Sequence, residues 1–388
     1  MLTGGVAPGW EPVRDAFVRG RAGDPGAAQL AVHHHGRPVV DLAAGPPGFG
    51  TDSVGVLMSV TKGLVAVCAH LLSERGALDL DAPVARYWPE FAAAGKAGTT
   101  VADLLTHRAG LPAFSAGPAG CGLLDRDARV GALAAMRPVW EPGTACLYHA
   151  LTYGHLVGEV VRRVSGRSIG AFFAAEVAGP LGLDLWIGLP AEEEHRFAPQ
   201  FSVRPDPSPE QVAGFLAGLG LAPEAPLSRA LRASQAEVAA AVRGLATREG
   251  RAAELPGAGG IGNARSLSRL YAALIGPVEG VRLLSPATLE RAVAARDDVP
   301  PPPPLDGGDP EGRSRFGLGF ELPRKGLPML GEGSFGHAGA GGRLGMADPG
   351  SGLAVGYVCT AMAWEPAAGP DPRWTDWTEA VTATAAAL

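Results

Sequence analysis

Hydrophobic residues near the N-terminus first follow a helical period and then alternate. The spacing of Val13, Phe17 and Val18 predicts a helix within residues 9–20 that presents one apolar face. Residues 28–45, AQLAVHHHGRPVVDLAAG, are typical of two strands joined by a turn at Gly36. The chain is therefore predicted to open with a helix followed by two strands.

Helical patterns dominate the middle of the chain. Apolar residues recur at helical spacing in residues 63–76, 100–110 and 153–166. Gly110 is predicted to cap the second of these helices. Ser208, Pro209 and Gln211 form the pattern of a capping box at another helix start, and Ser285 opens a similar segment. We expect a long helical region here.

The C-terminal part returns to strands after a proline-rich loop at 300–304. Short strands are predicted in residues 315–322, 334–339, 343–349 and 352–362, followed by a helix from about Trp374. Strands at both ends predict an α/β (α+β) fold in which one antiparallel sheet is built from both termini and flanked by helices. We expect residues 1–65 and 250–388 to form this sheet domain. Residues 66–249 would form an inserted helical domain, with the active site in the cleft between the two.

Composition and charge narrow the class of protein. With 388 residues, of which 46% are hydrophobic, the chain is predicted to form a packed globular protein. Its net charge of -6 includes no charged run, which disfavours nucleic acid or a membrane surface as partner. The cysteines at 68, 121, 146 and 359 form no C-x-x-C pair, and the N-terminus lacks a signal-peptide pattern, so a cytoplasmic location is predicted. The oligomeric state is left open.

Lysine is rare in this chain, and one lysine follows a serine at helical spacing. Only Lys62, Lys96 and Lys325 occur among 33 basic residues. A buried lysine can lose its proton and act as a base, whereas arginine cannot at working pH. Ser59 and Lys62 are three residues apart, so on a helix their side chains lie on one face. This pattern indicates an activated nucleophile, with a capped surface helix as the alternative.

Four segments together carry a family resemblance. They are SVTK at 59–62, LLTHRAGL at 104–111, WEPGTACLYHALTYGHLVGEV from residue 140 and FGHAGAGG at 335–342. In order and spacing they resemble the serine beta-lactamase and penicillin-binding protein superfamily, specifically its class C beta-lactamase-like branch and the family VIII carboxylesterases. The fold of that family, a sheet domain built from both termini plus a helical domain, agrees with the fold predicted above.

The resemblance also implies a set of site residues. Ser59, Lys62 and Tyr148 would be catalytic, with Ser59 as nucleophile and the other two exchanging its proton, so that either could act near neutral pH. The backbone N–H groups of Ser59 and Ala340 would form the oxyanion hole. His337, Ala338 and Gly339 would contact substrate where beta-lactamases have Lys-Thr-Gly. His107 would support the helix end near the site.

The sequence departs from the family pattern at three substrate-contacting positions. Ala150 stands where class C beta-lactamases have asparagine, and His337 and Ala338 replace the lysine and threonine of the triplet. A largely neutral imidazole binds an anion more weakly than ammonium, and a methyl group cannot hydrogen-bond. We therefore expect a serine hydrolase acting on small carboxylic esters through an acyl-enzyme. The alternatives are an acyltransferase, then a beta-lactamase or D-Ala peptidase, and a non-catalytic binding module.

No metal ion or cofactor is expected. GAGGIG at 257–262, with Glu279 further on, matches a dinucleotide-binding pattern, but the residues before it do not form a predicted strand. This segment is better explained as a loop that enters the next helix. His33, His34 and His35 are adjacent on a strand, so their side chains alternate between faces and cannot converge on one ion.

Overall fold

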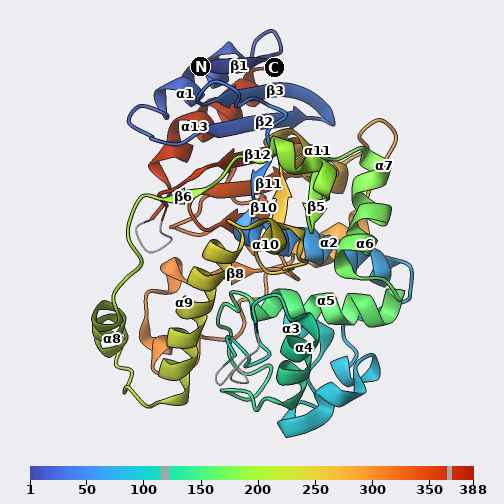
Figure 1. Ribbon diagram of the computed structural model, residues 1–388. Helices are drawn as coiled ribbons and strands as arrows, with labels where there is room; N and C mark the ends of the chain where they lie inside the picture. Colours follow the sequence, from blue (N-terminus) through green and yellow to red (C-terminus); the bar gives the residue numbers. More distant parts are fainter. Residues whose placement is uncertain (115–121, 365–368) are drawn as a thin grey trace.

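An eight-stranded antiparallel sheet forms the centre of the computed structural model, which describes residues 1–114, 122–364 and 369–388 (Figure 1). The strand order is β1-β3-β2-β12-β11-β10-β9-β8, so the two ends of the chain meet where β2 pairs with β12. This confirms the predicted sheet built from both termini. The strands are β1 (Leu2–Val6), β2 (Ala28–His34), β3 (Arg37–Ala44), β8 (Arg315–Phe316), β9 (Glu321–Leu322), β10 (Phe335–Gly339), β11 (Arg343–Asp348) and β12 (Leu353–Cys359).

Helices cover both faces of this sheet. Figure 1 shows α1 (Glu11–Arg19) beside α13 (Pro372–Ala387), although they come from opposite ends of the chain. Val355 packs in the same core as Trp377 of α13, whereas its neighbour Ala354 belongs to the core that contains Leu267 of α11 (Ala264–Ile275). Successive strand residues therefore serve opposite layers, as the two-residue period of a strand requires.

Helix α2 (Thr61–Glu74) lies between the sheet and the helical middle of the chain. Every residue of α2 from Thr61 to Leu72 is buried. The helix contacts β10 on one side and α5 (Thr152–Ser165), α6 (Ile169–Phe173) and α12 (Pro286–Val293) on others. A helix that is apolar all round is suited to this central place. The single lysine of α2 is consequently held in the interior.

A small second sheet positions the chain just before α2. In it β4 (Gly55–Val56) and β5 (Leu185–Ile187) both pair with β7 (Gly260–Gly262). The Leu57 N–H extends this pairing by donating to the Gly260 carbonyl at 2.8 Å. The remaining elements are α3 (Val101–Leu105), α4 (Arg126–Ala135), α7 (Gly179–Leu181), α8 (Pro209–Gly218), α9 (Pro226–Gly244), α10 (Arg248–Ala252), β6 (Phe201–Ser202) and β13 (Ala361–Met362).

Most local signals in the sequence are confirmed. The strands on either side of Gly36 form as predicted, with Gly36 at a φ of 76°. Ser208 caps α8 and forms a capping box with Gln211. Ser285 caps α12, and GAGGIG runs through β7 to Asn263, which caps α11. These turns and helix caps depend only on residues that are close in sequence, so they form in the folded chain as predicted.

Three local expectations were wrong. The chain opens with the strand β1, because pairing with β3 makes a strand of a glycine-rich segment that shows no alternation. Val18 is 48% exposed, since only Val13 and Phe17 face the core. Helix α3 ends at Leu105, so Gly110 does not cap it; His107, at a φ of 61°, already leaves the helical conformation.

Two further features bear on the predicted location. Cys68, Cys146 and Cys359 are free thiols, and Cys121 lies outside the described residues. Among the residues that the structure describes, no helix is both long enough and apolar enough to span a bilayer. The predicted division into residues 1–65 with 250–388 and residues 66–249 stays a prediction.

Candidate active site

Ser59 lies in a tight turn that leads directly into α2. The turn is a 3₁₀ segment, Met58–Val60, and Met58 has a φ of 50°, a left-handed conformation uncommon for residues other than glycine. The Thr61 hydroxyl donates to the Met58 carbonyl at 2.6 Å and accepts from the Gly260 N–H at 2.8 Å. These two bonds hold a backbone conformation that costs roughly 1–2 kcal/mol on its own, and they leave Ser59 half-buried at the start of the helix.

Lys62 joins the Ser59 turn to the loop before β7. Its side chain is fully buried, and Nζ donates to Ser59 Oγ at 3.1 Å and to the Gly257 carbonyl at 2.8 Å. Burial lowers the pKa of Lys62 from 10.5 to about 7, while the negative charge of Glu321 acts in the opposite direction. Near neutral pH, a large fraction of the protein therefore holds this amine as a free base next to the serine hydroxyl.

Tyr148 completes a group of three with Ser59 and Lys62. The Tyr148 ring centroid lies 4.8 Å from Lys62 Nζ, and its hydroxyl hydrogen-bonds with Ser59. Burial raises the pKa of Tyr148 above its usual value, as does the charge of Glu321, and the bond to Ser59 only partly offsets this. Tyr148 therefore remains a phenol near neutral pH. The sequence leaves either group free to act as base; of the two, Lys62 is the one whose pKa is moved towards neutral pH.

His107 supports the segment that carries Tyr148. It is buried just after α3, and its Nδ1 accepts a hydrogen bond from the His149 N–H at 3.1 Å. The rings of His107 and Tyr148 lie 4.8 Å apart. His149 binds the same loops together, because Nε2 accepts from the Leu111 N–H at 3.0 Å. These contacts lie on the segment of Tyr148, and the predicted role of His107 in supporting the helix end stays a prediction.

Strand β10 brings the predicted triplet to the Ser59 turn. Gly339 passes so close to this turn that an added β-carbon would overlap the Leu57 carbonyl oxygen and lie 3.3 Å from the Met58 β-carbon. Only glycine allows this approach. The close contact brings Ala340, the next residue, near the Ser59 turn; its place in an oxyanion hole with Ser59 is implied by the family resemblance and stays a prediction.

His337 is buried and held neutral. Its Nδ1 lies 2.7 Å from the Ala338 carbonyl and 3.3 Å from Glu321 Oε2, so Nδ1 carries the proton. Burial lowers the pKa of His337, although Glu321 works against this effect. His337 Nε2 has no hydrogen-bond partner among the described residues. The imidazole therefore brings no positive charge to the site.

Two groups at the site were missed from the sequence. Glu321 of β9 is buried, and its carboxylate accepts the Ala338 N–H at 2.7 Å. The sequence does carry a signal for Glu321, because it is a charged residue inside a predicted apolar strand. The Gly257 carbonyl, which accepts from Lys62, belongs to the segment that resembled a dinucleotide motif.

His33 and His34, in the interior strand β2, point to different sides of the sheet. His33 Nδ1 contacts the Ser268 hydroxyl at 2.9 Å, whereas the His34 ring lies against Trp10 at 5.6 Å. Ser268 belongs to α11 and Trp10 directly precedes α1, and these two helices lie on opposite faces of the sheet. The alternation expected for adjacent strand residues is thus observed for His33 and His34.

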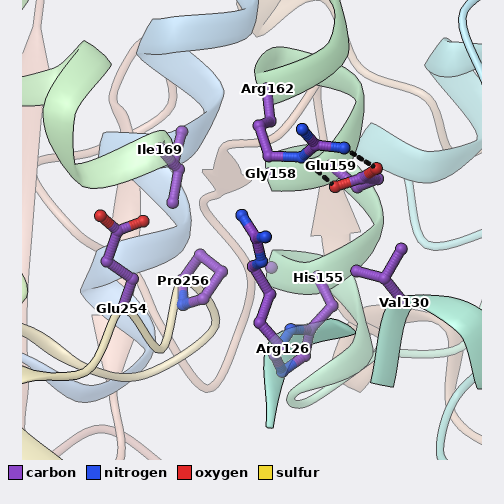
Figure 2. A pocket seen from close by; sticks show the side chains of 10 residues that line it. Arg126, Val130, His155, Gly158, Glu159, Arg162, Ile169, Glu254 and Pro256 are labelled. Atoms are coloured by element: carbon purple, nitrogen blue, oxygen red, sulfur yellow. Dashed lines mark hydrogen bonds and ion pairs between the residues drawn. The ribbon is translucent and has the colours of Figure 1, made fainter. Parts of the chain in front are cut away.

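Figure 2 shows a separate hollow at α5 that does not reach Ser59. Arg126 points into it from α4, and Glu159 is held by Arg162 at 2.7 Å in an ion pair. Its volume of about 20 Å³ suffices for little more than one water molecule. It is therefore too small to receive an organic substrate.

Comparisons with known proteins show the family and the fold of this chain. The family described as Beta-lactamase matches residues 13–376. Esterase/beta-lactamase LipL of Mycobacterium tuberculosis (strain ATCC 25618 / H37Rv) is 34% identical over 356 residues, which cover 86% of this chain and 76% of that protein.

Two solved structures extend the likeness over nearly the whole chain. The crystal structure of a family VIII carboxylesterase is 35% identical with a TM-score of 0.84, covering 99% of this chain and 100% of that one. EstA from Arthrobacter nitroguajacolicus Rue61a is 32% identical with a TM-score of 0.83, covering 98% of each chain. The resemblance predicted from the sequence is thus confirmed, and the chain belongs to the beta-lactamase family.

Proposed function

We propose that this protein is a serine hydrolase that cleaves small carboxylic esters through an acyl-enzyme at Ser59. The observation that carries the proposal is the contact between Ser59 Oγ and a fully buried Lys62 whose pKa is lowered to about 7. A base with a pKa near the working pH is the most effective partner for a serine hydroxyl.

The first half-reaction follows from the protonation states at the site. Neutral Lys62 takes the proton of Ser59 as Oγ attacks the ester carbonyl, and the ester C–O bond then breaks. The proton passes through Lys62 and the Tyr148 phenol to the leaving oxygen, which departs as an alcohol. A water molecule next attacks the acyl-enzyme, gives its proton to Lys62, and releases the acid while Ser59 Oγ regains a proton.

The N–H groups of Ser59 and Ala340 are proposed to bind the negative oxygen of the tetrahedral intermediate. The support is the close passage of β10 at Gly339 against Leu57 and Met58, next to the start of α2. Preorganised donors of this kind each contribute about 3–4 kcal/mol to lowering the barrier.

Esters are proposed over beta-lactams because of the residues beside the nucleophile. His337 is neutral and its Nδ1 is occupied by Ala338 and Glu321, so it is a poor anchor for a carboxylate. Ala338 and Ala150 offer no side-chain hydrogen bond. The similar solved structure described as a family VIII carboxylesterase supports ester cleavage, whereas LipL is described as both an esterase and a beta-lactamase and does not separate the two.

The test is turnover of p-nitrophenyl butyrate by the wild type, Ser59→Ala and Ser73→Ala. Ser73 lies at the far end of the same helix and serves as the matched control. We expect Ser59→Ala to lose activity by several orders of magnitude and Ser73→Ala to keep it. Equal turnover by Ser59→Ala and the wild type would remove Ser59 from the mechanism.

Water is proposed as the acyl acceptor, and the cytoplasm as the location. Adding alcohol or amine acceptors to the same assay distinguishes transfer from hydrolysis, because transfer would yield a new ester or amide at the expense of butyrate.

The support for a cytoplasmic, reducing compartment is that the cysteines within the described residues, at 68, 146 and 359, are unpaired. Fractionation of cells that produce the protein tests the location.

A further inference from the structure

A cavity of about 350 Å³ opens beside Tyr148. One wall contains Leu147, Tyr148 and Phe316, and the Phe316 ring stacks on that of Tyr148 with 6.1 Å between centroids. Arg296 and Ser314 also line it. This volume accommodates a group of the size of a substituted aromatic ring.

Backbone hydrogen bonds fix the walls of this cavity to one another. The Cys146 N–H donates to the Pro300 carbonyl at 2.9 Å, and the Arg296 N–H donates to the Phe316 carbonyl at 2.8 Å. The Arg108 guanidinium donates to the Arg296 carbonyl at 2.5 Å. The segment that carries Arg296 is therefore tied both to the Tyr148 segment and to β8. A site held in this way needs little rearrangement to bind a ligand.

The charged side chains lining the cavity are mostly arginine. They are Arg296, Arg313 and Arg315, with Asp297 as the acidic member. Arg315 pairs with Asp297 at 3.2 Å, and Arg313 donates to the carbonyls of Asp306 and Gly308. The Nε atoms of Arg296 and Arg313 are both buried and have no hydrogen-bond partner within the described ranges, but Arg313, unlike Arg296, makes hydrogen bonds there through the rest of its guanidinium.

The two acidic residues that follow Arg296 in sequence, Asp297 and Asp298, are each engaged by another arginine. The hydrogen bond from Arg108 and, to a smaller extent, the charge of Arg296 lower the pKa of Asp298, whose carboxylate accepts two hydrogen bonds from Arg108, at 2.6 and 3.3 Å. With three arginines and one aspartate in its lining, the cavity thus has an excess of positive charge. Guanidinium groups bind carboxylate and phosphate strongly and with defined geometry.

We propose that this cavity receives the leaving alcohol of the ester and that Arg296 selects alcohols carrying a carboxylate or phosphate group. The inference rests on the proposed function, in which Tyr148 lies on the path of the proton to the leaving oxygen. The rest of the alcohol then extends from Tyr148 into the cavity that Tyr148 lines. Arg296 acts on specificity and has no part in the covalent steps.

The experiment compares two acetyl esters of matched shape, 4-acetoxybenzoate and 4-acetoxybenzamide, with p-nitrophenyl acetate as a general ester substrate. They are tested with the wild type, Arg296→Met and Arg291→Met. Arg291 is the matched control, because it lies on α12, is exposed and pairs with Asp81 at 2.8 Å outside the cavity. Assays at low and high salt measure the contribution of charge.

We expect the wild type to prefer the benzoate, and Arg296→Met to lower kcat/KM for the benzoate by about tenfold or more. Turnover of the benzamide by the same variant should stay unchanged, which also shows that the variant is folded. High salt should reduce the preference of the wild type, and Arg291→Met should behave as the wild type.

Three results would overturn the inference. Equal turnover of both esters by the wild type, or an unchanged preference in Arg296→Met, would show that the cavity does not select anions while leaving the proposed function intact. An equal loss on both esters in Arg296→Met would assign Arg296 a structural role. Absence of turnover of all three substrates, p-nitrophenyl acetate included, would instead contradict the proposed function itself.

Discussion

Replacing Lys62 with methionine should abolish activity and make the protein more stable at neutral pH. Methionine has nearly the length of lysine and no charge, so it fits the same buried space. The pKa of Lys62 falls from 10.5 to about 7 on burial. Between these two pH values the unfolded chain binds more protons at this position than the folded chain, so stability from this group rises with pH. The charge therefore opposes folding most strongly at pH 7 and below.

The size of this effect follows from the pKa change. One pKa unit corresponds to about 1.4 kcal/mol, so the penalty near pH 7 is on the order of 4 kcal/mol. Methionine removes the penalty but leaves the Gly257 carbonyl and Ser59 Oγ without the donor that Lys62 provides. An unsatisfied buried acceptor costs about 1–3 kcal/mol. We expect a net gain of roughly 1–3 kcal/mol at pH 7 that shrinks as the pH rises and becomes a net loss of up to about 2 kcal/mol by pH 10, where the charge penalty has nearly vanished but the acceptor is still unpaired.

Thermal unfolding of the wild type and Lys62→Met at several pH values between 6 and 10 measures this difference. Lys325→Met is the control, because the Lys325 side chain is 68% exposed. The wild type should also show an acid limb in kcat/KM near pH 7, reporting protonation of Lys62. A lower melting temperature for Lys62→Met at pH 7, or a difference that does not change with pH, would refute this reasoning.

Other substitutions at the site have distinct expected outcomes. Glu321→Gln keeps an acceptor for the Ala338 N–H but removes a negative charge that raises the pKa of Lys62. The acid limb of kcat/KM should therefore move to lower pH. A shift to higher pH would contradict the assignment of this limb to Lys62. Tyr148→Phe should lower kcat by about 10²–10⁴ with little change in melting temperature, as measured by steady-state kinetics and thermal unfolding; full activity would exclude the phenol from proton transfer. Gly339→Ala should reduce both stability and activity, because the added β-carbon would overlap a backbone carbonyl. Gly98→Ala should have little effect on either, because no atom lies within 4 Å of the added β-carbon. Equal melting temperatures for the two variants would show that β10 can move away from the Ser59 turn.

The sequence predicts those parts of the site that depend on local spacing. Ser59 and Lys62 are three residues apart, so a single helical turn is enough to bring their side chains together. Capping residues such as Ser208 and the turn at Gly36 could be predicted for the same reason. Tyr148 was found only because the family resemblance supplies what spacing along the chain does not.

Groups that reach the site from distant segments could not be predicted. Glu321 acts through a hydrogen bond to β10, and Gly257 acts through a backbone carbonyl that any residue could provide. Strand β1 depends on its partner β3 and carries little pattern of its own. In each case the determining contact is long-range, and a single sequence does not show which segments meet.

The central claim is that Ser59 is the nucleophile, activated by Lys62. Treating the protein with an alkyl fluorophosphonate, which forms a stable adduct with activated serines, and mapping the modified peptide would test it most directly. The account predicts one adduct, on Ser59, with labelling and ester turnover lost together and labelling greatly slowed in Lys62→Met. An adduct on another residue, or ester turnover that continues after Ser59 is fully labelled, would contradict it.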